Sequence, residues 1–173
     1  MHYGNNKPKY IRYAIYVAVI VIAAILQNSP GGIPEVLGAR ALVILPACVS
    51  IAMFEREIAA GVFGVVAGCL WDVSSGTDGN NAFVLLVVCA VCSLLISHFM
   101  RNNVLTALVL GSGGIVIYNF ARIIFDIWLE GAGISLKQFF TFYFTSGIYT
   151  LAFVPVFYFI VSWIYNSHKT ADE

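Results

Sequence analysis

The chain has 173 residues and a formal net charge of zero; 60% of its residues are hydrophobic and only 10% are charged. Its mean hydropathy of +0.88 is far above that of average soluble domains. This composition excludes an ordinary soluble domain and indicates an integral membrane protein. The sequence has no basic run, so nothing in it favours nucleic acid as a partner.

Six apolar runs follow one another along the chain, each close to the roughly 20 residues that cross a bilayer as a helix. The connections between them are short, so no soluble domain is expected. We therefore predict an all-α integral membrane protein, a compact bundle of about six transmembrane helices in a single domain. The expected helices cover approximately residues 11–27, 37–54, 58–73, 82–100, 104–129 and 139–165.

Basic residues are unevenly shared between alternate loops, and the positive-inside rule converts this bias into a topology. With the N-terminus in the cytoplasm, only Lys137 falls in an outer loop. The inner set is Lys7, Lys9, Arg12, Arg56, Arg101 and Lys169. An even number of spans returns the C-terminus to the same side, so we expect both termini to be cytoplasmic.

The third apolar run carries the most informative pattern, because Gly64, Gly68 and Asp72 are spaced four apart and share one helix face. Gly61 precedes them, and Ser75 and Gly76 follow. Small residues at this spacing let another helix approach closely. They predict either ordinary packing within the bundle or a face that binds a partner helix.

Buried charges are expected at one depth, toward the outer leaflet. They are Arg40 in the second helix, Asp72 in the third, and Arg122 and Asp126 in the fifth, where Asn119 lies one turn earlier. Charges inside a membrane usually pair with one another. We predict a polar cluster that joins helices two, three and five, either as a structural ion-pair network or as a ligand-binding site.

Catalytic and metal chemistry find little support in the sequence. No histidine is placed near Asp72, and the outer serines have no base in reach. Four cysteines lie in apolar segments, where they are best interpreted as packing residues: Cys48, Cys69, Cys89 and Cys92. We therefore expect no catalytic residue, no metal and no cofactor.

Two features permit a transport role. Gly111, Gly113 and Gly114 could loosen the fifth helix, as happens in substrate-site helices, and Pro46 and Pro155 could kink the second and sixth. Close packing explains the same residues equally well.

The run from Gly61 to Gly76 resembles the signature of the MreD family of rod shape-determining membrane proteins. In that family a glycine-rich helix ends in a Gly-x-x-x-Asp-x-x-Ser-Gly-like stretch, which maps here to Gly68, Asp72, Ser75 and Gly76. The length, the six-helix count and the scarcity of loops are similar over the whole chain. The family pattern continues with Pro-Leu-Gly, where this chain has Asp78-Gly79-Asn80-Asn81 and only Gly79 is equivalent.

The resemblance implies a non-enzymatic membrane scaffold of the cell-wall elongation complex in the bacterial plasma membrane. Its direct partner would be MreC, a single-span protein with an extracytoplasmic domain. The actin-like MreB, the glycan polymerase RodA and a class B penicillin-binding transpeptidase would be indirect partners. The protein would support lateral peptidoglycan synthesis and the maintenance of cell shape.

The alternative is a substrate-binding S component of an energy-coupling-factor vitamin transporter, which is similar to MreD in architecture. Such proteins typically carry an Ala-x-x-x-Ala contact on the first helix, and Ala14 and Ala18 have that spacing. On this interpretation Arg40, Asp72 and Arg122 would line a vitamin pocket.

Overall fold

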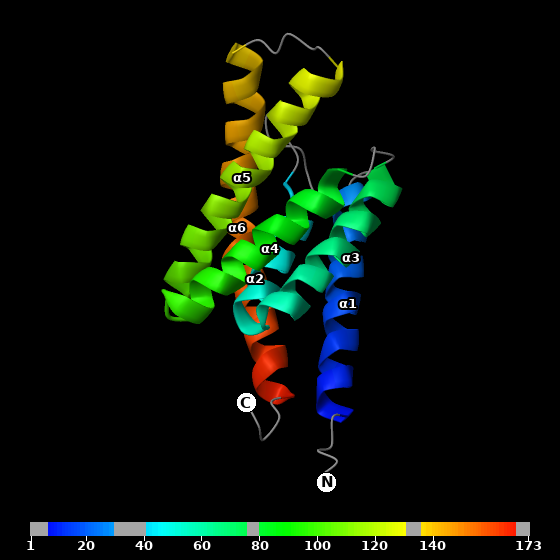
Figure 1. Cartoon of the computed structure of the whole chain (residues 1–173), viewed down its shortest axis with the longest axis vertical. Helices are drawn as coiled ribbons and strands as arrows, with labels where there is room; N and C mark the ends of the chain where they lie inside the picture. The colour runs from blue at the N-terminus through cyan, green and yellow to red at the C-terminus, as the bar shows by residue number, and fades with distance from the viewer. Residues whose placement is uncertain (1–6, 30–40, 76–79, 131–135, 169–173) are drawn as a thin grey trace.

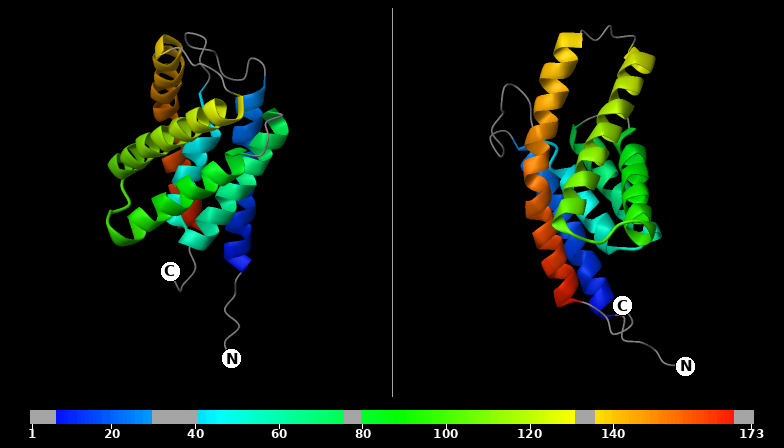
Figure 2. Two further views of the ribbon diagram at one scale, coloured as in Figure 1. Left: turned by 45° about the horizontal axis from the view of Figure 1, so that its top comes forward. Right: turned by 90° about the vertical axis from the view of Figure 1, so that its left-hand side faces the viewer.

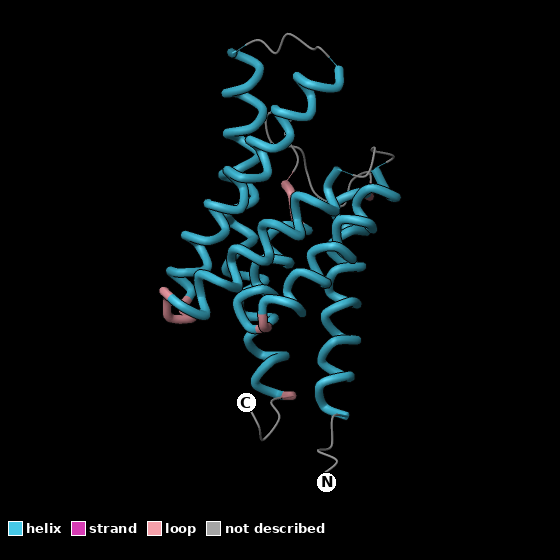
Figure 3. The backbone as a smooth tube through the Cα atoms, in the orientation of Figure 1, coloured by secondary structure: helices cyan, strands magenta, loops and turns pink. Residues whose placement is uncertain are grey.

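A computed structural model describes residues 7–29, 41–75, 80–130 and 136–168, and these residues form six α-helices (Figures 1 and 3). Side chains are described in all of these ranges except at residues 7–8, 126–130 and 136–144. The helices are α1 (Lys7–Asn28), α2 (Ile44–Phe54), α3 (Glu57–Ser75), α4 (Asn80–His98), α5 (Val104–Glu130) and α6 (Leu136–Ser167).

Five of these helices, all except α2, are long and apolar enough to cross a membrane. Their bounds agree with the predicted segments to within a few residues. Large apolar side chains are exposed along all five, from Ile22 on α1 to Trp163 on α6. The prediction of a multi-pass, all-α architecture is confirmed at this level, because outward apolar side chains suit contact with lipid.

Helix α2 differs from the prediction of a full span at 37–54. It has 11 residues, and the three described residues before it, 41–43, are not helical. Residues 37–40 lie outside the described part of the chain. Ten of the 11 residues in α2 are buried, and the helix contacts each of the other five. It is therefore a short central helix enclosed by the others.

Hydrogen bonds from two other helices and a proline explain where α2 begins. The N–H of Leu42 donates to the hydroxyl of Thr150 on α6, and the N–H of Ile44 donates to the side-chain oxygen of Gln27 on α1. Pro46 falls in the first turn, where its missing N–H removes no helical hydrogen bond. Pro46 is thus a residue of the helix start and not a mid-helix kink.

The helix ends fall into two groups (Figures 1 and 2). Helix α1 begins and α6 ends at one end of the molecule, which we call the terminal end. The connections from α2 to α3 and from α4 to α5 face the same way, while α3 ends and α4 begins toward the opposite, distal end. Helices α3 and α4 form the most extensive pair.

The glycines of α5 do not interrupt that helix, which is continuous from Val104 to Glu130. A Cβ at Gly111 would meet Val154 of α6, and one at Gly114 would meet Val88 of α4. These two glycines therefore bring α5 close to its neighbours. Gly113 has open space around it.

Candidate functional site

The closest helix contact described is made by two glycines of the motif in α3. A Cβ at Gly68 would lie 2.2 Å from the Cα of Ala82, and a Cβ at Gly64 would lie 2.7 Å from the main-chain oxygen of Leu85. Both contacts are with the backbone of α4, which no side-chain rotation relieves. Gly64 and Gly68 thus let α3 and α4 touch backbone to backbone, as small residues do in membrane bundles.

The carboxylate of Asp72, one turn beyond Gly68, caps the start of α4. Its Oδ1 accepts hydrogen bonds from the main-chain N–H of Asn81 at 3.3 Å and from Nδ2 of the same residue at 2.8 Å, and its Oδ2 accepts from the N–H of Ala82 at 3.2 Å. The first N–H groups of a helix have no carbonyl partner within it, and the helix dipole favours an anion there. The cap explains how a carboxylate is accommodated at this depth.

The same network extends to α5. The hydroxyl of Tyr118 donates to Oδ1 of Asn81 at 3.0 Å, and the Tyr118 ring stacks on Trp71 with centroids 5.0 Å apart and planes at 15°. All four side chains are buried. We call Asp72, Asn81, Tyr118 and Trp71 the Asp72 network; it ties α3, α4 and α5 together at the distal end.

Only some residues of the predicted polar cluster have described side chains. Arg40 lies outside the described residues, and Asp126 lies on α5 with its side chain outside them. Asn119 and Arg122 are half-buried on α5, and no described hydrogen bond joins either to Asp72. The described link from α3 to α5 instead runs through Asn81 and Tyr118.

Sequence reasoning missed Asn81 and Tyr118, although each had a signal. Asn81 stands at the start of an apolar run, a typical place for a residue that satisfies helix N-terminal groups. Tyr118 immediately precedes Asn119, the first residue of the predicted polar stripe on α5.

The remaining residues of the predicted packing face have different surroundings. A Cβ added at Gly61 would meet nothing within 4 Å. The hydroxyl of Ser75 donates to the carbonyl of Trp71 in its own helix at 2.7 Å. Gly76 lies outside the described residues. The described contact with α4 therefore involves Gly64 and Gly68 but not Gly61.

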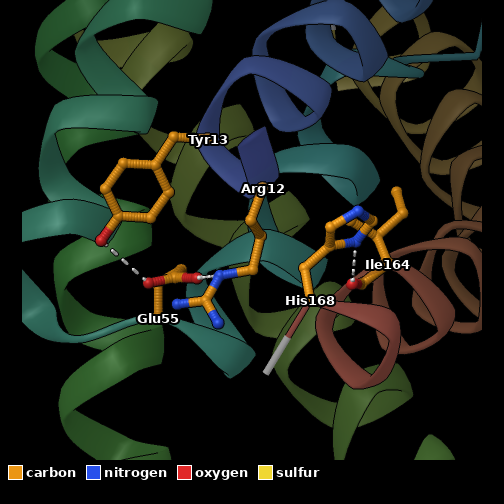
Figure 4. Close-up of polar contacts among 5 residues, drawn as sticks. All are labelled: Arg12, Tyr13, Glu55, Ile164 and His168. Carbon is orange, nitrogen blue, oxygen red and sulfur yellow. Dashed lines mark hydrogen bonds and ion pairs between the residues drawn. The ribbon is translucent and has the colours of Figure 1, made fainter. Parts of the chain in front are cut away.

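A second polar cluster lies at the terminal end (Figure 4). Arg12 of α1 and Glu55, which follows α2, form an ion pair with 2.8 Å between Nε and Oε1. Their side chains are 0% and 4% exposed. The hydroxyl of Tyr13 donates to the other carboxylate oxygen of Glu55 at 3.3 Å. This buried pair joins α1 to the connection between α2 and α3.

Aromatic rings and main-chain contacts complete the surroundings of this pair. The Arg12 guanidinium carbon lies 4.8 Å from the ring centroid of Tyr165 on α6, within the range of a cation–π interaction. The hydroxyl of Ser93 on α4 donates to the main-chain oxygen of Glu55 at 2.8 Å. Nearby, a ring nitrogen of His168 lies 3.1 Å from the carbonyl of Ile164 (Figure 4). We call Arg12, Tyr13, Glu55 and Tyr165 the Arg12 cluster.

The sequence analysis assigned Arg12 to the inner set of topology charges and gave Glu55 no role. The missed signal is that Arg12 falls inside the predicted helix 11–27, where a charge needs a partner. Glu55 is one of the few acidic residues that follow an apolar run directly. Arg12 and Glu55 are 43 positions apart, so the sequence alone did not indicate that they pair.

The chemistry of both clusters is that of helix association. Each charged group faces donors, acceptors or an aromatic ring of another helix, which suits them to hold helices in fixed positions. Among the described residues, no group of three or more His, Cys, Asp or Glu side chains gathers to hold a metal ion. Cys48, Cys89 and Cys92 are buried in the core, whereas Cys69 is exposed.

Comparison of the chain with protein-family models, with curated proteins and with solved structures finds no match.

Proposed function

We propose that this protein is a non-catalytic membrane scaffold of a bacterial cell-wall elongation complex, similar to MreD, and that it binds MreC. One observation carries the proposal: Gly68 and Asp72, two of the four residues that carry the resemblance, have a defined joint task. Gly68 sets the contact between α3 and α4, and Asp72 caps α4 from that contact. A motif in which glycine and aspartate act together over one turn is more informative than small residues alone.

The surroundings of Asp72 favour the scaffold over the transporter alternative. In a vitamin pocket, Asp72 would have to serve a ligand. Here both of its oxygens accept hydrogen bonds from α4, and those N–H groups would lose their acceptor if Asp72 turned toward a ligand.

One observation keeps the S component as the second candidate. Ala14 and Ala18 are both exposed on α1, as an Ala-x-x-x-Ala contact with another subunit requires. Alanine is frequent in membrane helices, so this exposure weighs less than the fit of the glycine and aspartate motif.

Co-purification tests the two candidates against each other. The tagged protein, expressed with MreC encoded by the same genome and solubilised in mild detergent, is expected to retain MreC in a fixed ratio. The same preparation is analysed by mass spectrometry for bound vitamins. A stoichiometric vitamin together with no MreC would overturn the scaffold function and support the S component.

A further inference from the structure

Two arginines at the terminal end lie in connections between helices and not within the helices. Arg56 stands between α2 and α3, directly before an apolar span that begins at Glu57. Arg101 stands between α4 and α5, whose apolar spans end at His98 and begin at Val104. Both arginines are exposed, and both connections face the same end of the molecule (Figure 1). Since these spans are long enough to cross the bilayer, the two guanidinium groups lie at the level of the lipid headgroups.

Side-chain hydrogen bonds fix the two connections in place. Nδ2 of Asn102 donates to the main-chain oxygen of Met53, near the end of α2, at 3.1 Å. The hydroxyl of Ser93 on α4 donates to the main-chain oxygen of Glu55 at 2.8 Å. The first bond joins the residue after one arginine to α2, and the second joins α4 to the residue before the other. The fold itself therefore sets where both arginines leave the main chain.

Neither arginine is used to hold the fold together. Within the described part of the chain, neither guanidinium group forms a hydrogen bond, an ion pair or a ring contact. The acidic neighbours do not change this: Glu55 pairs with Arg12, and Glu57, half-buried at the start of α3, makes no ion pair with a described residue. A guanidinium group binds a phosphate through two parallel N–H bonds. Both arginines are thus available to an external anion.

Exposed apolar side chains accompany the arginines. Phe99 and Met100, directly before Arg101, are 83% and 36% exposed, and both lie outside the apolar spans of α4 and α5. Exposed apolar residues within a span are covered by lipid tails, but a connection that stands in water would leave these two side chains uncovered. An aromatic ring beside a basic residue is typical of a segment that inserts at the boundary between headgroups and acyl chains.

The two kinds of side chain at one level match an amphiphile with an anionic head. Free phosphate would satisfy the arginines but would leave Phe99 and Met100 uncovered. We propose that Arg56 and Arg101 bind headgroup phosphates of anionic phospholipids such as phosphatidylglycerol. Phe99 and Met100 insert among the acyl chains of the same lipids. We call these four residues the headgroup site; it does not depend on MreC, so its failure would leave the scaffold function intact.

Thermal unfolding of the full chain in a neutral detergent tests the proposal. The melting temperature is measured with added dioleoyl-phosphatidylglycerol, with dioleoyl-phosphatidylcholine, which has the same tails but no net charge, and with inorganic phosphate. A ligand that binds only the folded state raises the melting temperature. We expect phosphatidylglycerol to raise it more than phosphatidylcholine does, and inorganic phosphate to leave it unchanged. An equal rise with phosphatidylcholine, or the same rise with inorganic phosphate, would overturn the proposal.

Substitutions assign the effect to the headgroup site. We expect the rise with phosphatidylglycerol to shrink in Arg56→Gln and in Arg101→Gln, to vanish in the double variant, and to shrink in Phe99→Ser. Lys9→Gln is the control, because it removes a basic residue of α1, a helix without contact to α4 or α5 in the described structure. Each rise is measured against the same variant without lipid, so a less stable variant still gives a result. A full rise in the double variant, or an equal loss in Lys9→Gln, would contradict the assignment.

Discussion

At the scale of single residues, Asp72 is expected to stabilise the fold through its cap on α4. Asp72→Ala removes the acceptor of two main-chain N–H groups and one amide, and should lower the free energy of unfolding by about 1–3 kcal/mol. Asp72→Asn keeps one oxygen and should fall between Ala and the native residue. Thermal unfolding in detergent measures both.

Ser112→Ala is the control for this prediction, because the Ser112 hydroxyl donates only to a carbonyl one turn back in its own helix. A loss of stability in Ser112→Ala equal to that in Asp72→Ala would contradict the role of the cap.

The ion pair of Arg12 and Glu55 should show strong coupling between its partners. Removing one partner of a buried pair typically costs about 3–5 kcal/mol, because the other charge stays buried without compensation. We expect Arg12→Ala and Glu55→Ala each to destabilise strongly, and the double variant to lose much less than the sum. A double-mutant cycle on thermal or denaturant unfolding measures this coupling.

Arg56→Ala provides the matched control, since Arg56 is the exposed neighbour of Glu55. Arg56→Ala should change the free energy of unfolding only by the small amount typical of surface substitutions. Strict additivity of the Arg12 and Glu55 substitutions would show that the two side chains do not interact in the folded protein.

At the scale of elements, the contact between α3 and α4 depends on the missing Cβ of Gly68. In Gly68→Ala the new Cβ would lie 2.2 Å from the Cα of Ala82, so the two helices have to separate and the Asp72 cap has to lengthen. We expect a large fall in the melting temperature. Gly61→Ala, on the same helix but in open space, should leave it unchanged or raise it, because alanine favours the helix. Equal melting temperatures for the two variants would contradict the described packing.

Side chains of other helices hold the chain where it enters α2. Thr150→Val keeps the shape of the side chain but removes the acceptor for the N–H of Leu42, which should cost about 1–3 kcal/mol in this buried setting. Thr106→Val removes an exposed hydroxyl bond near the start of α5 and should cost little. Unfolding in detergent compares the two isosteric variants, and a cost for Thr106→Val that matches or exceeds that of Thr150→Val would argue against this cap.

At the scale of the whole molecule, the proposed orientation places the terminal end in the cytoplasm. Green fluorescent protein fused after Glu173 should be fluorescent, and alkaline phosphatase fused there should be inactive. Fusions that end at Gly79, in an outer loop of the predicted topology, should show the reverse. Active phosphatase at Glu173 would invert the proposed orientation.

Hydropathy alone was enough to predict the helical class and the approximate bounds of α1, α3, α4, α5 and α6, because lipid forces long apolar helices. It failed for α2, where burial among other helices leaves the same apolar composition without a full span. The glycine spacing correctly singled out Gly64 and Gly68 as small residues of one face. It could not say which helix they meet.

Partners that are distant in the chain account for the rest of what was missed. Arg12 pairs with Glu55, and Asp72 caps α4 by accepting a hydrogen bond from Asn81. These contacts arise only after the helices have assembled. A single sequence indicates that a buried charge needs a partner. It does not report which of several polar residues supplies it.

The enclosed position of α2 also has a consequence for biogenesis. Thr150 binds the chain just before the helix, and Tyr158 and Tyr165 contact Phe54 at its end. All three residues belong to α6, which is synthesised well after α2. Until α6 enters the membrane, the second segment lacks the neighbours that enclose it. A nascent chain stalled before α6 is therefore expected to leave α2 exposed and sensitive to membrane proteases, so that α6 protects a segment made about 90 residues earlier.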